Sequence, residues 1–303
     1  MNVLMDCLSF ALKELTGRCR EGSFATQAAR ARGLQAIAKE LKGMGYHLPG
    51  VASLKPKHVQ ALVARWKGLD LNDATIRNRL GWVRWWAMKA NKPGLIPNDN
   101  AVFGLAERTP YQGNRARILT PEVTAKVKDA ATLMALRLQA AFGLRREEAL
   151  KLRPGRAIQR DRLCLKASWT KGGRYREIPI THERQQALLL ELRAMVGDGS
   201  LIGEGRRYVD AMNAYRHHTR VAGLGNAHGL RHAWAQWQYK ARTGRDCPAA
   251  GGPTLEALSA DERRQDYAAR LEIARELGHN RIDVTDTYLG RRYQAAPKRD
   301  RAA

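Results

Sequence analysis

Apolar residues in the first hundred positions recur every three to four residues, which is the spacing of one face of an α-helix. Segments with this pattern cover residues 4–15, 26–44, 56–66 and 72–90. Asn72 or Asp73 can cap the last of these helices, because both side chains accept hydrogen bonds from backbone N–H groups. The pattern predicts a helical domain over residues 1–105.

A turn-rich stretch interrupts the helical pattern at residues 93–100, where Pro, Gly and Asn cluster. The polar segment behind it carries Arg115 and Arg117. We therefore expect an interdomain linker over residues 106–118. The length of 303 residues agrees with two domains, because single cores usually stop growing near this size.

Helical patterns return after the linker. Thr120 and Pro121 provide an N-cap and a proline at the first helical position. Thr181 is expected to cap a later helix that Gly197 ends. The helices predicted here lie near residues 123–127, 132–142, 147–152 and 183–196, and the chain is mostly helical again beyond Val209, with a loop at 243–253 and a short helix at 255–270.

Residues 157–180 have the two-residue alternation of a β-strand instead. Apolar positions alternate over residues 163–167 and again over 176–180, and Lys171-Gly172-Gly173-Arg174 between them favours a hairpin turn. Lys171 is expected at the tip of this hairpin. The predicted fold is therefore mainly α with a small antiparallel β-sheet: an N-terminal helical domain, then a mixed α+β domain over residues 119–303.

The chain is strongly basic, with 53 Lys and Arg against 29 Asp and Glu and a formal charge of +24. Residues 1–105 hold 16 cationic against 7 anionic side chains, and the remaining residues hold 37 against 22. An excess of this size in both parts attracts a long polyanion, so nucleic acid is the expected partner. An ordinary enzyme from a lineage with arginine-rich proteins is the alternative explanation.

The helix predicted at residues 72–90 combines basic residues with Trp82, Trp85 and Trp86. This composition suits a helix that lies along a DNA groove and contacts phosphates. It equally suits a helix whose tryptophans face the core and whose charges face water. The predicted DNA-binding residues are Arg77, Arg79, Arg84, Lys89, Arg115, Arg117 and Arg174.

The sequence contains little that would indicate a metal site, a disulfide bond or a membrane span. The four cysteines are widely spaced, so neither a zinc module nor a disulfide framework is expected, and a reducing cytosol fits best. No apolar run approaches the roughly 20 residues of a membrane span. No Gly-Lys-Ser/Thr phosphate loop and no carboxylate cluster suited to Mg²⁺ occurs, so no cofactor is expected.

Residues suited to phosphate chemistry occur as a series of short boxes. They are Gly143-x-Arg145-x-x-Glu148, Lys171 in the hairpin, His228-x-x-Arg231, Leu277-Gly278-His279, and Tyr288 nine positions later. Their types, order and spacing resemble the catalytic domain of the tyrosine recombinases, the phage integrase family that includes the Xer recombinases. The resemblance spans roughly residues 119–290, and the N-terminal helices agree in length and character with the family's core-binding domain.

The resemblance implies that Arg145, Lys171, His228, Arg231, His279 and Tyr288 are catalytic and that no metal takes part. Paired guanidiniums neutralise the negative charge of a phosphodiester under attack. A phenol is protonated at neutral pH, so Tyr288 must lose its proton as it attacks, and His228 is the candidate acceptor. Lys171 can protonate the leaving 5′ oxygen, and His279 would hydrogen-bond the same phosphate. Glu148 is expected to orient its surroundings.

Each of these residues has a competing interpretation. Lys171 fits an ordinary hairpin lysine. Arg145 fits a surface arginine at a helix end, although Arg146 suits that place better. His228 and His232 have the i, i+4 spacing of a metal pair, but Arg231 between them would repel a cation. Tyr293, Tyr267 and Tyr239 compete with Tyr288, and the spacing from His279 favours Tyr288.

One feature departs from the family pattern. Arg231 and His279 are 48 positions apart, more than in a compact Xer-like recombinase, and the excess predicts an insertion near residues 243–266. Only a short basic tail follows Tyr288. In the family such tails dock onto neighbouring protomers, and this one could equally bind DNA.

The resemblance implies a site-specific DNA recombinase, the integrase of a mobile element, that forms a 3′-phosphotyrosyl intermediate. Its partners would be double-stranded DNA at a specific site, further copies of itself, as a monomer or dimer before synapsis and a tetramer in the synaptic complex, and accessory directionality or bending proteins. It would be cytoplasmic and associated with the nucleoid. A DNA-relaxing enzyme like the type IB topoisomerases and a non-catalytic DNA-binding regulator on the same fold are the alternatives.

Overall fold

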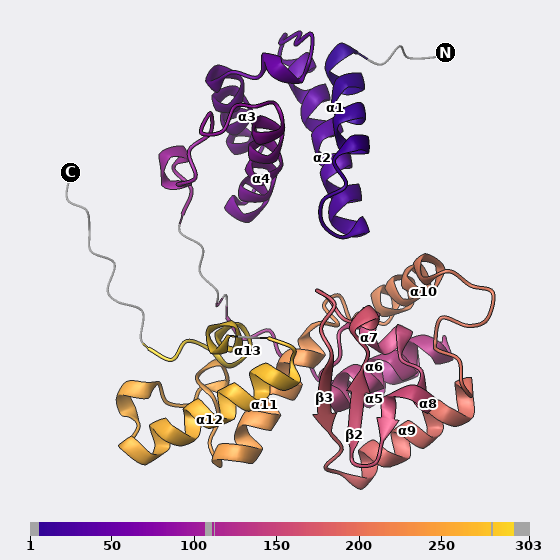
Figure 1. The fold of residues 1–303 in the computed structure, drawn as a ribbon. Helices are drawn as coiled ribbons and strands as arrows, with labels where there is room; N and C mark the ends of the chain where they lie inside the picture. The colour runs from indigo at the N-terminus through magenta and orange to yellow at the C-terminus, as the bar shows by residue number, and fades with distance from the viewer. Residues whose placement is uncertain (1–5, 107–110, 112, 280, 294–303) are drawn as a thin grey trace. The chain divides into compact units, whose positions relative to one another are not determined.

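The computed structural model describes residues 6–106, 111, 113–279 and 281–293 and divides into two compact units, Met1–Thr109 and Pro110–Ala303 (Figure 1). Together the units contain many helices and one three-stranded antiparallel sheet. The predicted fold class, mainly α with a small antiparallel sheet, is therefore confirmed. No helix in the described residues is long and apolar enough to cross a membrane.

The first unit consists of helices and loops, without a strand in residues 6–106. Asp6, Ser23 and Asn72 cap three of its helices, and each side chain accepts a hydrogen bond from the backbone N–H three residues later. Its elements are α1 (Cys7–Arg18), α2 (Phe24–Gly43), α3 (Pro56–Gly68) and α4 (Asp73–Lys89), with short 3₁₀ helices at Val51–Ser53 and Ala101–Phe103.

Two tryptophans fill the core of the first unit. Trp66 and Trp86 are fully buried and pack among leucines from α1 to α4. Each indole N–H also has an acceptor: Trp66 Nε1 donates to Glu40 Oε2 at 2.5 Å and Trp86 Nε1 donates to the Val51 carbonyl at 2.9 Å. Burying an indole stabilises the fold most when its N–H is satisfied in this way.

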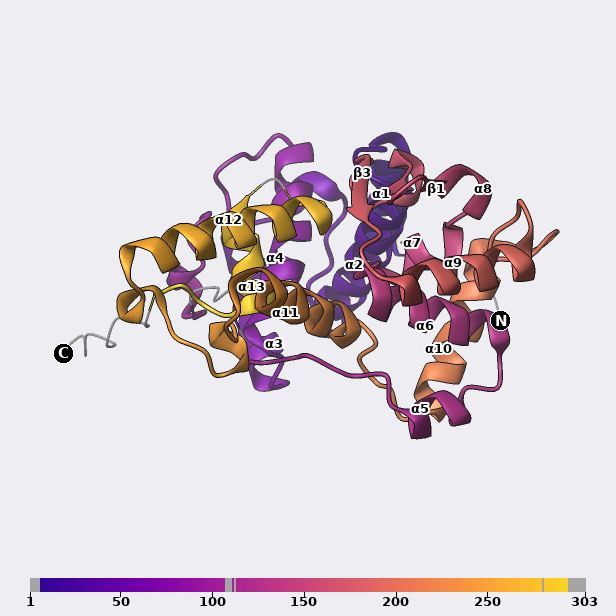
Figure 2. The same ribbon diagram turned by 90° about the horizontal axis from the view of Figure 1, so that it is seen from below.

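The second unit contains the sheet, with helices beside and behind it in Figure 1. The helices are α5 (Pro121–Lys126), α6 (Ala130–Phe142), α7 (Arg146–Lys151), α8 (Pro154–Ala157), α9 (Glu183–Val196), α10 (Tyr208–Val221), α11 (Gly229–Thr243), α12 (Ala260–Glu276) and α13 (Asp286–Leu289). Helix α11 packs against α6 on one side, and α12 and α13 lie beside it in both views (Figures 1 and 2). Apolar residues of α6, α9, α11 and α12 form one continuous core.

The sheet differs from the predicted hairpin. Strands β1 (Ile158–Gln159), β2 (Arg162–Leu165) and β3 (Arg176–Pro179) pair in that order, all antiparallel. Because Leu165 is the last paired residue of β2, residues 166–175 form a long connection instead of a tight turn. Ala167, predicted in a strand, belongs to a 3₁₀ helix (Ala167–Trp169) within this connection.

One predicted N-cap and one predicted helix start were also wrong. Helix α9 has the predicted bounds, but its N-cap is His182 and not Thr181, because the Gln185 side chain accepts hydrogen bonds from the backbone N–H groups of both residues. The helix expected at residues 255–270 is α12, Ala260–Glu276. Ser259 starts it with a capping box, in which Ser259 N donates to Glu262 Oε2 and Glu262 N donates to Ser259 Oγ.

Candidate active site

A single buried carboxylate gathers three guanidinium groups in the second unit. Glu148, in the first turn of α7, is fully buried and accepts two hydrogen bonds from Arg176 on β3, at 2.8 and 2.7 Å. It also accepts one from Arg145 Nη1 at 2.8 Å, and Arg231 Nη1 lies 4.0 Å from it. Burial opposes the charge of Glu148, but the three arginines outweigh it and lower its pKa to about 2.

Arg231 connects three separate parts of the unit. Its side chain is fully buried, and its Nη1 and Nη2 donate to the backbone carbonyls of Gly143 and Leu277. Its Nε donates to the Tyr288 hydroxyl at 3.4 Å. Burial lowers the pKa of Arg231 to about 10, which still leaves it cationic at neutral pH. These bonds use three of the five N–H groups of a guanidinium, so the group can still donate to a phosphate.

Helix α6 ends at a glycine, Gly143, because α6 and α11 pack closely there around Arg231. Gly143 has φ = 60°, in the left-handed region that favours glycine. A Cβ at this position would lie 2.5 Å from the Trp234 ring of α11. Without a side chain, Gly143 lets α6 and α11 approach closely enough for Arg231 on α11 to reach the Gly143 carbonyl.

Tyr288 lies among three imidazoles. It is 5% exposed, and its ring centroid is 4.6 Å from that of His232, 5.8 Å from His279 and 6.1 Å from His228. The Arg231 guanidinium carbon lies 5.6 Å from the same ring. The nearest rival tyrosine, Tyr293, is 60% exposed. The structure thus brings together Arg145, Arg231, His228, His279 and Tyr288.

The three imidazoles are neutral at physiological pH. Burial, with nearby guanidiniums, lowers the pKa of His279 to about 3. Burial and its cationic neighbours lower the pKa of His232 to about 4. Desolvation, with Arg231 and Arg145 next, lowers the pKa of His228 to about 4. A neutral imidazole can accept a proton, and an arriving phosphate would make protonation easier.

Lys171 lies at the edge of this cluster. It is exposed, on the turn that follows the 3₁₀ helix of the β2–β3 connection. Its charge contributes to the lowered pKa of His228, after the larger effects of burial and the two arginines. Lys171 therefore lies near enough to affect that imidazole electrostatically, on a turn that hydrogen bonds between Thr170 and Arg174 close.

Two residues of the cluster were not predicted from the sequence as site residues. Arg176 is 6% exposed, and its Nε has no hydrogen-bond partner. His232 is 3% exposed, and its Nδ1 has none either. His279 Nε2 is a third buried nitrogen without a partner. Beside His279 a cavity of about 390 Å³ opens, and Arg174, Arg176 and Arg275 line it together with Glu177.

The four predicted DNA-binding residues of α4 all contact their own unit. Arg77 donates to the Ala106 carbonyl, and Arg79 pairs with Glu40 at 2.8 Å. Arg84 donates to the Pro97 carbonyl and to Asn100, and Lys89 pairs with Glu21. The tryptophans of this helix face inward in part: Trp86 is fully buried, and Trp82 and Trp85 pack against the core.

The predicted DNA-binding residues of the second unit are more accessible. Arg115, Arg117 and Arg174 are all exposed. The segment with Arg115 and Arg117 crosses the start of α11, where Arg117 N donates to the Gly229 carbonyl at 3.0 Å. Arg115 also contributes to the lowered pKa of His232, after burial and His228. Two of these cations therefore lie close to the cluster, Arg115 beside His232 and Arg174 beside His279.

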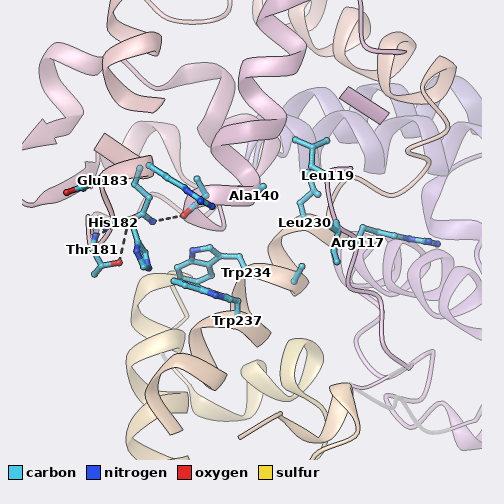
Figure 3. Close-up of a pocket in the computed structure, with 14 residues that line it drawn as sticks. Arg117, Leu119, Ala140, Thr181, His182, Glu183, Leu230, Trp234 and Trp237 are labelled. Atoms are coloured by element: carbon cyan, nitrogen blue, oxygen red, sulfur yellow. Dashed lines mark hydrogen bonds between the residues drawn. The ribbon is translucent and has the colours of Figure 1, made fainter. Parts of the chain in front are cut away.

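A larger cavity, about 900 Å³, lies on another face of α11 (Figure 3). Trp234 and Trp237 line it from α11, and His182 and Glu183 from the start of α9. None of the six predicted catalytic residues lines it. In the described residues, no group of three or more His, Cys, Asp or Glu side chains is arranged as metal ligands.

Comparison with known sequences finds two matching family models. Residues 5–94 match the model described as the N-terminal part of phage integrase, and residues 113–237 match the model described as integrase. No curated protein matches the chain.

Several solved structures share the fold at low sequence identity. A lambda integrase dimer bound to a COC' core site has 13% identity and a TM-score of 0.59, over 96% of this chain and 79% of that one. The Tn1549 transposon integrase in complex with circular intermediate DNA has 14% identity and a TM-score of 0.55, over 95% and 96%. XerH recombinase bound to difH has 16% identity and a TM-score of 0.54, over 96% and 82%.

Proposed function

Because the chain belongs to the phage integrase family of tyrosine recombinases, we propose that it is a site-specific recombinase of a mobile element. It would cut and rejoin DNA through a 3′-phosphotyrosyl intermediate. The observation that carries this proposal is the position of Tyr288, whose hydroxyl accepts a hydrogen bond from the buried Arg231 guanidinium and whose ring lies among three neutral imidazoles.

The pocket has an excess of positive charge for a phosphodiester. Arg145, Arg176 and Arg231 surround a single carboxylate, Glu148, so the cluster keeps a net positive charge. The unpartnered Nε2 of His279 supplies a further polar group. Preorganised donors of this kind stabilise the charge that develops on non-bridging oxygens during attack. Arg145 and Arg231 would hold those oxygens, and His279 would hydrogen-bond the same phosphate.

Cleavage would proceed as one balanced transfer. The bond from Tyr288 Oη to phosphorus forms while the bond from phosphorus to the 5′ oxygen breaks. The phenol proton passes to His228, a neutral imidazole whose ring centroid lies 6.1 Å from that of Tyr288, and Lys171 donates a proton to the departing 5′ oxygen. The phosphotyrosine conserves the energy of the broken bond, so the reverse step reseals DNA without ATP.

The assembly expected for this reaction contains several protomers. Lambda integrase, which shares the fold, has been seen as a dimer on a core site and as a tetramer on a Holliday junction. We extend this to the present chain: two protomers on each duplex and four in the synaptic complex.

A nicked suicide duplex tests the chemistry directly. A set of such duplexes, tiled across the DNA that flanks the coding sequence, should trap a covalent adduct with the native protein on one of them. Tyr288→Phe should bind that duplex and form no adduct, whereas Tyr293→Phe, a control at an exposed tyrosine, should behave as native. Arg145→Gln should slow adduct formation by about 10²–10³-fold, as loss of an oxyanion donor does.

Other results would redirect the proposal. An adduct with Tyr288→Phe would show that another residue is the nucleophile. Binding without an adduct on any duplex would favour a non-catalytic DNA-binding regulator. Relaxation of supercoiled plasmids of unrelated sequence would favour an enzyme like the type IB topoisomerases.

A further inference from the structure

Helix α13, which carries Tyr288, is tied to α12 by one guanidinium. Arg270 Nη1 donates to Asp286 Oδ1 at 3.1 Å and to the Gly290 carbonyl at 3.3 Å. Asp286 and Gly290 each lie two positions from Tyr288, on opposite sides along the chain. A single nitrogen of Arg270 therefore holds both ends of the segment that presents the tyrosine.

Arg270 is itself fixed in place. Its Nε donates to both carboxylate oxygens of Asp266, at 2.9 and 3.0 Å, and the Tyr239 hydroxyl on α11 donates to Asp266 Oδ1 at 2.7 Å. Arg270, Asp266 and Tyr239 are 0%, 2% and 1% exposed. Because Arg270 and Asp266 are buried charges paired with each other, moving either one would leave the other unpaired in a low-dielectric interior.

The segment expected to be an insertion supports α13 from another side. Leu255 N donates to the Arg292 carbonyl at 2.8 Å. Gly290 has φ = 86°, and a Cβ there would lie 2.5 Å from the backbone nitrogen of Ala249, so the 3₁₀ helix Pro248–Ala250 packs directly on it. The expected insertion at residues 243–266 thus provides contacts for the segment that carries Tyr288.

Helix α13 cannot hold this position alone, because it has four residues and a single turn is unstable in water. We infer that Arg270, with Asp266 and Asp286, is a positioning set that fixes α13 so that each protomer presents Tyr288 to its own pocket. The inference rests on the proposed function for the role of Tyr288. Arg270 contacts no residue proposed to react and acts on Tyr288 through Asp286 and Gly290.

Amide hydrogen exchange without DNA tests the positioning separately from catalysis. Arg270→Lys and Asp286→Asn should each speed exchange in residues 286–292 by at least about tenfold, while α6 stays protected. Arg242→Lys is the matched control, because Arg242 also joins α11 to α12, through Glu272 at 2.9 Å and Glu276 at 2.6 Å, and none of its hydrogen bonds reaches α13. Unchanged exchange in both test variants would overturn the inference, even in a chain that cleaves no DNA.

Adduct formation at saturating nicked duplex then measures the consequence. A misplacement of about 1 Å at the reacting atom costs on the order of 10²-fold in rate. Asp286→Asn should therefore slow adduct formation by about 10²-fold while its affinity for the duplex stays native. Asp286 is at the edge of the set, with its side chain 17% exposed, so this variant should fold even where Arg270→Lys does not. A native rate would contradict the inference.

Mixing an inactive protein with a slowed one distinguishes a positioning role from a simple loss of stability. Tyr288→Phe has a pocket without a nucleophile, and Arg145→Gln has a nucleophile without a full pocket. Their mixture should form no adduct beyond that of either alone. A chain with both Arg145→Gln and Asp286→Asn should release Tyr288 from its own pocket, so that Tyr288 reacts in the pocket of a Tyr288→Phe protomer. The adduct then forms on the double variant, which a mass tag identifies. More adduct in the first mixture than Arg145→Gln forms alone, or no increase in the second, would count against the inference, whereas failure of the native protein to form any adduct would count against the proposed function.

Discussion

The two units differ in how they use their polar side chains. The predicted DNA-binding residues of α4 in the first unit each bind an oxygen atom of the same unit; they are Arg77, Arg79, Arg84 and Lys89. Among the described residues, buried side-chain nitrogens and oxygens without a hydrogen-bond partner occur in the second unit alone. Those of Arg176, His232 and His279 lie in the cluster around Tyr288.

This difference separates residues that build a fold from residues that are ready for a ligand. A buried polar atom without a partner costs about 1–3 kcal/mol of stability. The three in the cluster around Tyr288 would be satisfied by the phosphodiester of the proposed reaction, and the other six in the described residues belong to Arg146, Trp234, Arg245, Arg270, Glu276 and Arg292. We therefore predict that DNA affinity depends more on basic residues beside the Tyr288 cluster than on the paired basic residues of α4. Three experiments test this comparison.

The largest expected effect concerns the carboxylates at the centre of each unit. Glu148→Gln leaves Arg176 and Arg231 buried with a weakened partner, so the second unit should lose about 3–5 kcal/mol of unfolding free energy. Glu40→Gln in the first unit weakens one ion pair with Arg79, and its amide can still accept from Trp66, so the loss should be about 1 kcal/mol. Urea unfolding followed by hydrogen exchange mass spectrometry reports each unit separately.

Equal losses of unfolding free energy after Glu148→Gln and Glu40→Gln would contradict the difference between the two units. The exposures make the difference expected: the Glu148 side chain is 0% exposed and that of Glu40 is 17% exposed. Water can therefore compensate a weakened Glu40 pair and cannot reach Glu148.

A smaller effect should follow from pH. The pKa values of His228, His232 and His279 are lowered in the folded protein, so between pH 6.5 and about 4 the unfolded chain binds more protons than the folded one. Stability is therefore full above pH 6.5 and falls as the pH decreases toward 4. For His232 the change from 6.5 to about 4 corresponds to roughly 3 kcal/mol, reached only near pH 4.

The same measurement across pH 7 to about 4 distinguishes the units. The second unit should lose most stability, and His232→Gln should flatten its pH dependence. Glu148 adds a further loss below pH 4.5, because its stabilising pKa shift disappears as the pH falls toward about 2. The first unit should lose less, through His58, whose pKa burial also lowers. A flat profile for the second unit above pH 4.5 would contradict the neutral imidazoles.

Rules that relate residues a few positions apart were enough to predict most helices and strands and the motifs suited to phosphate chemistry. Asn72 and Thr120 cap helices as expected, and Gly143 ends one, because caps depend on residues a few positions apart. The same kind of rule, applied to Ser259 and Glu262, would have placed the start of α12 correctly. The cap at Thr181 failed because a longer side chain, Gln185, took both backbone N–H groups.

Long-range contacts were beyond those rules. Arg231 binds carbonyls 88 and 46 positions away, and no sequence period connects such partners. Arg176 is an intermediate case. It shares the inward face of β3 with Ile178, so the alternation that predicted the strand also placed this arginine inside. Only the structure gives it a partner, Glu148, at the centre of the cluster.

The smallest expected effect concerns DNA affinity itself and compares one arginine from each unit. Arg174 is exposed beside the cavity next to His279, whereas Arg79 is paired with Glu40 and lies 5.4 Å from the Trp66 ring. Each phosphate contact adds about 0.9 to the slope of log affinity against log salt. Arg174→Gln should therefore lower that slope by about one and weaken binding a few-fold, within about 1 kcal/mol.

Arg79→Gln should leave the salt slope unchanged, because its guanidinium is already committed to Glu40. Fluorescence anisotropy with a labelled duplex of arbitrary sequence, over a range of salt concentrations, measures both variants, and urea unfolding confirms that each is folded. If Arg79→Gln lowers the slope as much as Arg174→Gln does, the ion pair opens on DNA, and the basic face of α4 binds phosphate as its sequence predicted. Internal pairing would then be a resting state of a DNA-binding helix, and unpartnered atoms would no longer distinguish the two units.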